Sequence, residues 1–370
     1  MSKTIFYGAF GRHNFGDMLF PHIIESLLAS NSVKAELEYC DIISRDMSEY
    51  GGHKVRSISD FFDYEGQINV IHVGGEVGYC PLDYAKMACE PKPININELD
   101  KISNSRMNNM AYILPKSTFK QSNIFIANSI GGISKKALNN MTEYEYIGFR
   151  DASSYKQASK NQTGKCNLVP DSAVMSRYFF EEKISSRSQS EAIKNLNKSI
   201  GSNYIAIQIN AEQLNKNSED FIQKFEKIIS KIQLPLVFFC AGIARGHDSL
   251  NLFKEKFQKR LPTTMIHFFE GLNIWDICNL ISNAKLVAST SLHVRILAQQ
   301  YFIPRITIDP HAKQVEFIKK WDNIKNLKTP LVSSNIERLI LNHDPEADAK
   351  QLKFLESEYL TKSTWINLLK

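Results

Sequence analysis

Short apolar segments alternate with amphipathic stretches along the first half of the chain. Residues 4–7 have the pattern of a buried strand and lead into a glycine-bearing loop. A helix is indicated after this loop by apolar residues at helical spacing: Leu19, Ile23, Ile24, Leu27 and Leu28. Further strands are expected at 33–39, 69–73, 123–128, 144–149 and 167–169. This alternation predicts a parallel sheet covered by helices.

The same alternation restarts in the second half. Strands are expected at 204–209, 236–240, 265–269, 286–288 and 305–308. Between the halves, residues 181–203 are polar and Ser-rich, which is typical of an interdomain connection or an exposed helix, and we place the domain boundary here. The sequence therefore predicts an α/β protein with two Rossmann-like, doubly wound domains facing a cleft, over 1–180 and 204–332. Residues 333–370 are expected to form helices that pack back on the first domain.

Composition supports a globular protein of two domains. The 370 residues are 43% hydrophobic and 23% charged, and this length exceeds what one hydrophobic core usually supports. The formal net charge is +6, but the basic residues are spread along the chain. Because a nucleic-acid footprint needs clustered charge, we expect no nucleic-acid partner. Anionic substrates, or a membrane face that carries acidic lipids, would suit this charge.

The sequence shows no sign of a membrane span, a leader or a zinc site. The most apolar stretch, 234–244, is shorter than a membrane helix and contains Pro235 and Gly242. The N-terminus lacks the apolar core of a signal peptide, which predicts a cytoplasmic protein, either free or at the inner face of the membrane. The six cysteines form no Cys-x-x-Cys pair, so neither a zinc site nor a disulfide framework is expected.

Glycine or polar turns follow most of the strands expected in the first half. These turns are Gly74-Gly75, Gly131-Gly132, Arg150-Asp151 and Pro170-Asp171. The carboxyl ends of strands in an open α/β sheet line the ligand crevice. We therefore expect these turns to lie in one cleft.

The loop from Gly8 to Asp17 is the strongest local feature of the first half. It follows a strand, carries three glycines and ends at an Asp that could cap the next helix. Backbone amides at such a helix start can hold an anion, although a tight turn with a plain helix cap gives the same pattern. Neither the Gly-x-Gly-x-x-Gly fingerprint nor the Walker A pattern is present.

Three hydroxyl residues, Ser289 to Ser291, stand where a strand of the second half gives way to a helix. Hydroxyls at a helix start satisfy free amides or bind a phosphate together with them. His293 then falls in the first helical turn, where an imidazole can donate a proton near neutral pH. A structural histidine is the alternative interpretation.

Taken in order, these motifs resemble those of the polysaccharide pyruvyltransferase family. The matching residues, within a resemblance over 5–310, are Asn14-x-Gly16-Asp17, Gly74-Gly75, Arg150-Asp151-x-x-Ser154, Pro170-Asp171 and Ser291-Leu292-His293, followed by Ala298 and Ile303-Pro304. The resemblance implies a fold similar to GT-B glycosyltransferases. It also implies transfer of a pyruvyl group from phosphoenolpyruvate to sugar hydroxyls of a glycan or lipid-linked saccharide, with formation of a ketal.

The resemblance implies a role for each motif. His293 would protonate the donor's methylene carbon or its departing phosphate, and the backbone amides of Thr290, Ser291 and Leu292 would hold that phosphate. Asp17 would orient or deprotonate the acceptor hydroxyl. The acceptor side would be shaped by Asn14, Gly16, Gly74, Gly75, Glu76 and Arg150. This scheme needs no cofactor and no metal.

Two positions depart from the family pattern. Ser291 stands where members usually carry Arg, and Asn210 stands where a basic residue is frequent. The candidates for replacement cations on the donor side are Arg295, Arg245 and His247. The departures leave two alternatives open: a GT-B glycosyltransferase that uses a nucleotide-activated sugar, and a binding protein without catalytic activity.

Overall fold

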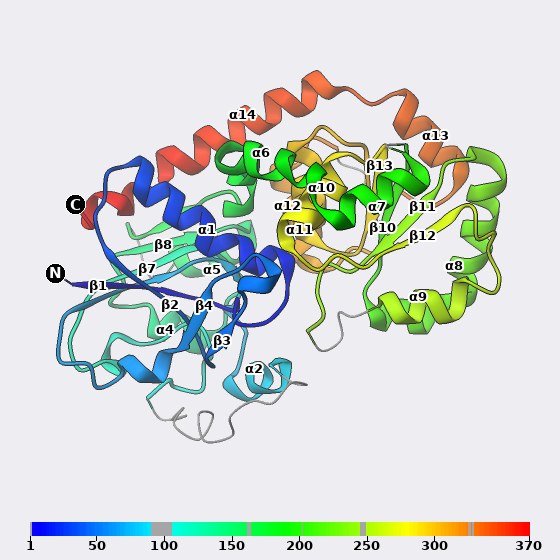
Figure 1. Cartoon of the computed structure of the whole chain (residues 1–370). Helices are drawn as coiled ribbons and strands as arrows, with labels where there is room; N and C mark the ends of the chain where they lie inside the picture. The colour runs from blue at the N-terminus through cyan, green and yellow to red at the C-terminus, as the bar shows by residue number, and fades with distance from the viewer. Residues whose placement is uncertain are drawn as a thin grey trace. The chain divides into compact units, whose positions relative to one another are not determined.

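The structure, a computed structural model, describes residues 2–89, 106–160, 164–201, 203–244, 249–324, 327 and 329–370 (Figure 1). The chain divides into two compact units. Unit 1 comprises Met1–Met175 and Leu355–Lys370, and unit 2 comprises Ser176–Phe354. Within the described residues, no helix has the length and apolar character needed to cross a membrane.

Unit 1 is built on a sheet of nine strands within the part of the chain that the structure describes, in the order β3-β4-β2-β1-β5-β7-β8-β9, with β6 beside β7. The strands are β1 (Lys3–Tyr7), β2 (Glu36–Asp41), β3 (Arg45–Asp46), β4 (Lys54–Ser57), β5 (Ile68–His72), β6 (Gly75–Glu76), β7 (Ser122–Gly131), β8 (Tyr146–Phe149) and β9 (Cys166–Leu168). The β3–β4 pair is antiparallel and the other pairs are parallel.

The helices of unit 1 connect these parallel strands. They are α1 (Phe15–Ser30), α2 (Leu82–Ala88), α4 (Lys135–Asn140) and α5 (Ala152–Ser159), with the short 3₁₀ segments η1 (Ser48–Tyr50), η2 (Ile58–Phe61), η3 (Lys116–Thr118) and η4 (Ser172–Met175). Strand residues such as Ile5, Val70, Phe125 and Ile147 are completely buried in the core of this unit. This apolar core holds the strand ends, and with them the polar turns, in fixed positions.

Unit 2 has a fully parallel five-stranded sheet within the described residues, in the order β12-β11-β10-β13-β14. The strands are β10 (Ile205–Gln208), β11 (Leu236–Phe239), β12 (Ile266–Phe269), β13 (Leu286–Ser289) and β14 (Arg305–Thr307). The helices are α6 (Ser176–Ser186), η5 (Arg187–Gln189), α7 (Glu191–Ile200), α8 (Ala211–Ile232), α9 (Leu250–Phe257), α10 (Ile274–Ser282), α11 (Leu292–Gln300), α12 (Ala312–Trp321) and α13 (Ser333–Leu341). Phe225, Phe238, Phe253 and Phe257 form an aromatic cluster in its core.

The polar stretch 181–203 folds as the end of α6, η5 and α7, and these helices belong to unit 2. Its polar composition reflects an amphipathic surface, because α7 buries Ile193 and Leu196 on one face and exposes most of its other residues. The division between the units falls earlier, between Met175 and Ser176.

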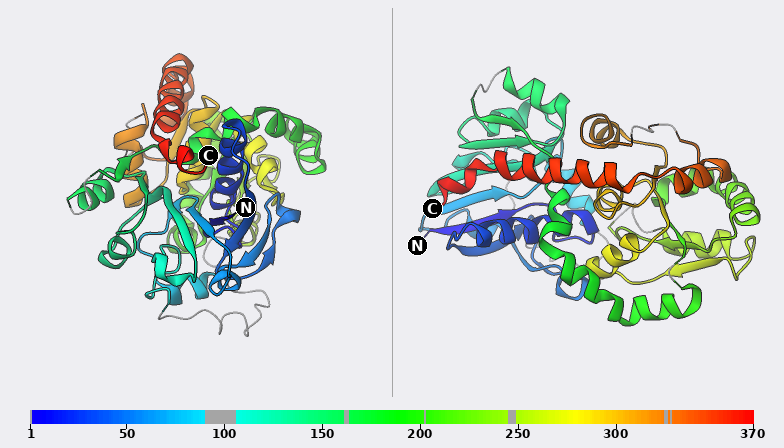
Figure 2. Two further views of the ribbon diagram at one scale, coloured as in Figure 1. Left: turned by 90° about the vertical axis from the view of Figure 1, so that its left-hand side faces the viewer. Right: turned by 90° about the horizontal axis from the view of Figure 1, so that it is seen from above.

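The C-terminal residues divide between the two units. Helix α13 packs on α8 in unit 2. Helix α14 (Pro345–Lys362) is one continuous helix (Figure 2), followed by η6 (Thr364–Leu368). Its first part belongs to unit 2, where Asp348 binds Arg305. Its last turns belong to unit 1, where the Tyr359 hydroxyl donates to Asn128 and Lys362 donates to the Leu168 carbonyl.

The α/β class and the parallel sheets expected from the sequence are confirmed. Each expected strand is present, although β2 begins three positions later than expected and β8 begins two positions later. The short strands β3, β4 and β6 were not predicted, because two to four residues give too little periodicity to detect.

Candidate active site

The polar turns of unit 1 gather at one edge of its sheet. Strands β1, β5, β7, β8 and β9 are neighbours and run parallel, so their carboxyl ends lie at the same edge. These ends lead into the Gly8–Asp17 loop, the Gly74–Glu76 turn, Gly131-Gly132, Arg150 and Asp171. The sheet therefore collects five sequence motifs that are far apart along the chain.

Arg150 connects three of these motifs through ion pairs. Its Nη1 donates to Oδ2 of Asp171 at 2.6 Å, and its Nη2 donates to Oε2 of Glu76 at 2.7 Å. The side chains of Arg150 and Asp171 are 4% and 0% exposed, whereas that of Glu76 is 36% exposed. Burial alone would lower the pKa of Arg150, but Asp171 and Glu76 raise it above its ordinary value. Glu76 is thus the member of this ion-pair triad that solvent reaches.

Two glycines make room for the triad. A Cβ on Gly131 would lie 2.5 Å from both Nε of Arg150 and Oε2 of Glu76. Gly132 has φ +69°, and its Cβ would lie 2.5 Å from the ring of Tyr79. Because any larger residue would displace the ion pair or this ring, the Gly131-Gly132 turn is required by the triad. Tyr79 itself is 59% exposed beside this turn.

Asp17 faces the Gly74-Gly75 turn from the first turn of α1. Its Oδ1 lies 3.5 Å from the position that a Cβ on Gly75 would take. Gly74 and Gly75 have φ values of +137° and +100°, in the region that favours glycine. The helix cap is Asn14, whose side chain accepts from the Gly16 amide at 3.2 Å. The expectation that Asp17 caps this helix is therefore wrong. The Asp17 carboxylate does not serve as the N-cap acceptor for the first amides of α1.

Arg12 is a charged residue of this edge that the sequence analysis missed. Its Nη2 lies 3.6 Å from Oδ2 of Asp17, and its Nε is buried without a hydrogen-bond partner among the described residues. The loop that carries it is fixed by Asp41, which accepts from the amides of Gly11 at 2.8 Å and Ile42 at 2.6 Å. Burial raises the pKa of Asp41 to about 6. These hydrogen bonds and the charge of Arg12 act in the opposite direction, but burial is the larger effect.

Unit 2 presents a hydrogen-bonded group at the carboxyl ends of β10 and β13. Oε1 of Gln208 accepts from the Ser289 hydroxyl at 2.7 Å, and Oγ1 of Thr290 accepts from the Asn210 amide at 3.0 Å. The Thr290 carbonyl accepts from Gln314 at 2.9 Å. The Thr290 amide donates to the Gln208 carbonyl at 3.1 Å, and the Ser291 amide donates to the Ser289 hydroxyl at 2.8 Å. These two amides, which were expected to hold a phosphate, are therefore used within unit 2.

His293 lies in the first turn of α11 and is half-buried. Ser291 is the helix cap, and its Oγ accepts from the Val294 amide at 3.5 Å. The residues on either side of Ser291, Thr290 and Leu292, are buried. The imidazole thus stands at the end of the helix where backbone amides and the helix dipole favour an anion.

Arg295 does not serve the donor side as expected. It is 1% exposed. Its guanidinium donates to Asp322 at 2.7 Å, to Thr307 at 2.7 Å and to the Ile324 carbonyl at 2.9 Å. These bonds tie α11 to β14 and to the end of α12, so we correct its role to a structural one. Arg245 and His247, the other expected cations, lie outside the described residues.

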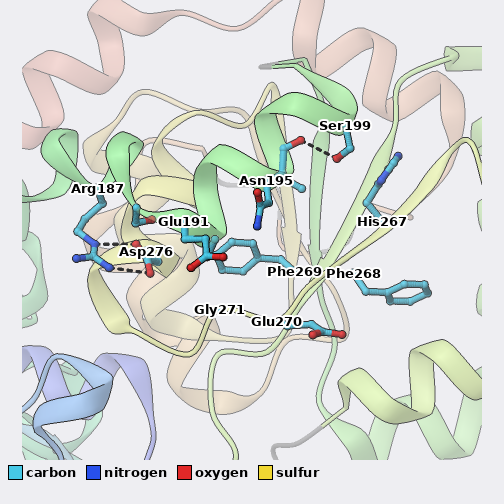
Figure 3. Close-up of a pocket in the computed structure, with 13 residues that line it drawn as sticks. Arg187, Glu191, Asn195, Ser199, His267, Phe268, Phe269, Glu270, Gly271 and Asp276 are labelled. Atoms are coloured by element: carbon cyan, nitrogen blue, oxygen red, sulfur yellow. Dashed lines mark hydrogen bonds and ion pairs between the residues drawn. The ribbon is translucent and has the colours of Figure 1, made fainter.

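A separate pocket of about 630 Å³ lies in unit 2, between α7 and the edge strand β12 (Figure 3). Arg187 and Asp276 form a two-bonded ion pair in its wall, at 2.7 and 2.9 Å. Within the described part of the chain, its lining includes none of the site residues expected from the sequence. It therefore adds no support to those expectations.

The two units, each built on a sheet of mainly parallel strands with helices, have a GT-B-like fold. Solved UDP-GlcNAc 2-epimerases are similar in fold. The enzyme from Rickettsia bellii has a TM-score of 0.59 at 10% identity, covering 100% of this chain and 98% of that chain. The enzyme from Methanocaldococcus jannaschii has a TM-score of 0.55 at 12% identity, covering 96% of this chain and 100% of that chain. At these identities the likeness concerns the fold alone.

The polysaccharide pyruvyl transferase family model matches residues 14–311, and the chain belongs to this family. The family expected from the sequence motifs is thereby confirmed, and the protein is a transferase. No curated protein matches the chain.

Proposed function

We propose that the protein transfers a pyruvyl group from phosphoenolpyruvate to two hydroxyls of a sugar in a surface-glycan precursor. The observation that carries this proposal is the ion-pair triad, because Glu76, Arg150 and Asp171 come from separate segments within the family match over 14–311 and meet at one sheet edge. In the reaction, two sugar oxygens bond to the central carbon of the donor and the phosphate leaves. One hydroxyl proton reaches the methylene carbon, which becomes a methyl group, and the other leaves with the phosphate.

Unit 2 supplies the donor chemistry in this proposal. His293 is the proton donor to the methylene carbon. Because the Thr290 and Ser291 amides already donate within unit 2, the phosphate is assigned to the Leu292 amide at the start of α11. Ser291 keeps this helix start in position as the helix cap. Arg295 donates to Asp322 and is therefore not among the residues that bind the donor.

Unit 1 supplies the acceptor chemistry. Asp17 accepts the proton of an attacking hydroxyl, and Arg12 positions that carboxylate from 3.6 Å. Glu76 is the solvent-exposed acceptor of hydrogen bonds from further sugar hydroxyls, and Arg150 fixes its position. Asn14, Gly16, Gly74 and Gly75 shape this edge because they allow the tight loop and turn next to Asp17.

Ligand-dependent thermal unfolding distinguishes the two donor classes. A ligand present at about 100 times its dissociation constant stabilises the folded protein by about 2.7 kcal/mol. This corresponds to a rise of roughly 5–11 °C in melting temperature for units of this size. We expect millimolar phosphoenolpyruvate to give such a rise and UDP-N-acetylglucosamine to give little. A rise with the nucleotide sugar or with UDP, and none with phosphoenolpyruvate, would contradict the proposal.

A glycosyltransferase that uses a nucleotide-activated sugar is the second candidate. It is favoured by one specific observation: the family's usual Arg is replaced by Ser291, and the structure uses that Ser as a helix cap. Release of inorganic phosphate from phosphoenolpyruvate in the presence of a glycan acceptor supports the first candidate. Release of UDP from a nucleotide sugar supports the second.

A further inference from the structure

We propose that unit 1 binds a divalent first-row transition metal at His22, Glu25 and His53. One ligand atom from each of these side chains lies within 4.8 Å of the others. Two imidazoles and one carboxylate are a ligand set that zinc and its neighbours in the first transition row accept. None of the ligands of this three-residue group, the α1 metal site, is among the residues assigned to the transferase reaction.

Helix geometry brings two of the ligands together. His22 and Glu25 are three positions apart on α1, so their side chains lie on the same face of that helix. His53 comes from the turn between η1 and β4. Sequence spacing alone did not indicate the site, because its third ligand comes from a separate segment.

A hydrogen bond orients the first imidazole. Nε2 of His22 lies 2.9 Å from the Gly51 carbonyl and must donate to it, since a carbonyl oxygen accepts. In the neutral ring the lone pair is then on Nδ1, the nitrogen that would coordinate a metal. Histidines that bind metals typically donate their other ring nitrogen to a carbonyl or carboxylate in this way.

Tyr39 orients the other two ligands. Its hydroxyl is hydrogen-bonded to Glu25, and because a carboxylate only accepts, the phenol donates this bond. The ring of Tyr39 also stacks on His53, with centroids 3.9 Å apart and an interplanar angle of 11°. Each of the three ligands is thus contacted by a group that limits its motion.

The turn that carries His53 is closely packed against α1. Gly51 has φ +81°, and a Cβ on Gly52 would lie 2.7 Å from Met18 and 3.0 Å from Met47. The backbone is therefore positioned without help from a metal. All three ligands are half-buried, so solvent reaches them and water would supply the fourth ligand of a tetrahedral ion.

The bound metal would link the 51–53 turn to α1. Asp17 and His22 are five positions apart on this helix, about 7.5 Å along its axis. Because an ion that binds the folded state alone shifts the folding equilibrium toward it, the metal stabilises the helix that carries Asp17. The inference does not depend on the proposed reaction.

The test uses the full-length, tag-free protein after removal of metals with a chelator. Titration with Co²⁺ is followed by visible absorption, and titration with Zn²⁺ by calorimetry and thermal unfolding. We expect one equivalent to bind, with the absorption of a nitrogen- and oxygen-ligated cobalt and without the charge-transfer band of thiolate ligation. At about 100 times the dissociation constant, zinc should raise the melting temperature by roughly 5–11 °C.

Variants separate this site from adventitious binding. H22A and H53A should abolish the shift, and Y39F should weaken binding by about 10–100-fold. H267A, which changes a half-buried histidine of β12, is the matched control and should bind as the unchanged protein does. If H22A fails to fold, H53Q tests the same point from outside α1. No metal-dependent shift in the unchanged protein, or an undiminished shift in the folded H53A or H53Q variant, would overturn the inference.

Discussion

Arg150 shows how a buried cation can serve both stability and the candidate site. Asp171, its fully buried partner, should matter for stability, whereas the exposed Glu76 should matter for turnover. Removing one partner of a buried pair costs about 3–5 kcal/mol, or roughly 6–20 °C in the melting temperature of unit 1. We therefore expect D171N to lower the melting temperature by that amount, and E76Q to reduce turnover with a much smaller thermal effect. Equal destabilisation by both variants, measured by calorimetry, would contradict this division of roles.

His293 gives the second prediction at the residue scale. A general acid contributes about 10²–10⁴-fold to rate, so H293A should lose turnover by a factor in that range. The side chain is half-buried and lies at a helix start, so the melting temperature should stay within about 2 °C of the original. The measurements are phosphate release and thermal unfolding, with H267A as the control. Retained activity in folded H293A would assign this histidine a structural role.

Single residues were harder to predict than the turns that contain them. The sequence located the Gly8–Asp17 loop, yet it selected Asp17 as the cap instead of Asn14, because both types cap helices well. Arg12 was not predicted as a site residue, because no local sequence pattern shows which side chain of the loop faces Asp17. Arg295 was predicted to bind the donor, because its ion-pair partner in the structure, Asp322, lies far away in the sequence. Side-chain direction in these cases depends on tertiary contacts.

At the scale of elements, Ser291 caps α11 where the family usually carries Arg. Replacing a Ser cap with Ala costs about 0.5–2 kcal/mol, or roughly 1–8 °C for unit 2. We expect S291A to show this loss in thermal unfolding, and S291G to show a smaller one because Gly is tolerated at this position. A melting temperature for S291A equal to that of the unchanged protein would show that the long 3.5 Å bond to Val294 contributes nothing.

The buried charges between α11, β14, α12 and α14 give a pH dependence. Burial raises the pKa of Asp322, but Arg305 and Arg295 outweigh it and hold that pKa well below its usual range. A carboxyl with a depressed pKa stabilises the folded state fully above its unfolded pKa of 3.8, and this contribution is lost as the pH falls below that value. Thermal unfolding at pH 3–7 should therefore show unit 2 weakening below about pH 4.

The D322N variant tests the source of this pH dependence. Its amide cannot ionise, so the variant should be destabilised at pH 7 by about 3–5 kcal/mol. The difference between D322N and the unchanged protein should narrow as the pH falls toward 3. A constant difference across this range would show that Asp322 is not the group responsible.

Elements with strong periodicity were predicted well, and those defined by packing were not. The buried strand β5 and the helix α1 follow from apolar spacing alone. Residues 181–203, which include α7, were interpreted as a connection or an exposed helix, because polar residues dominate their composition and the buried face of α7 is narrow. The assignment of α14 to both units depends on Asp348 and Tyr359, whose partners lie far away in the sequence.

At the scale of the whole molecule, each unit has its own sheet and its own apolar core. Phe125 on β7 and Phe238 on β11 are completely buried, one in each core. A Phe→Ala change in a core costs about 3–5 kcal/mol, because the removed ring leaves a cavity. Since the two cores are separate, a cavity in one should leave the packing of the other intact.

Calorimetric unfolding of the full chain should therefore resolve two transitions, as multi-domain proteins commonly do. F125A should lower the transition of unit 1 by roughly 6–20 °C, and F238A should lower the transition of unit 2 by a similar amount. Each variant serves as the control for the other, because the substitution is the same and only the core differs. Phosphoenolpyruvate should raise the transition that F238A lowers, since the proposed donor residues belong to unit 2. A single transition that both variants shift equally would mean that the units unfold as one body.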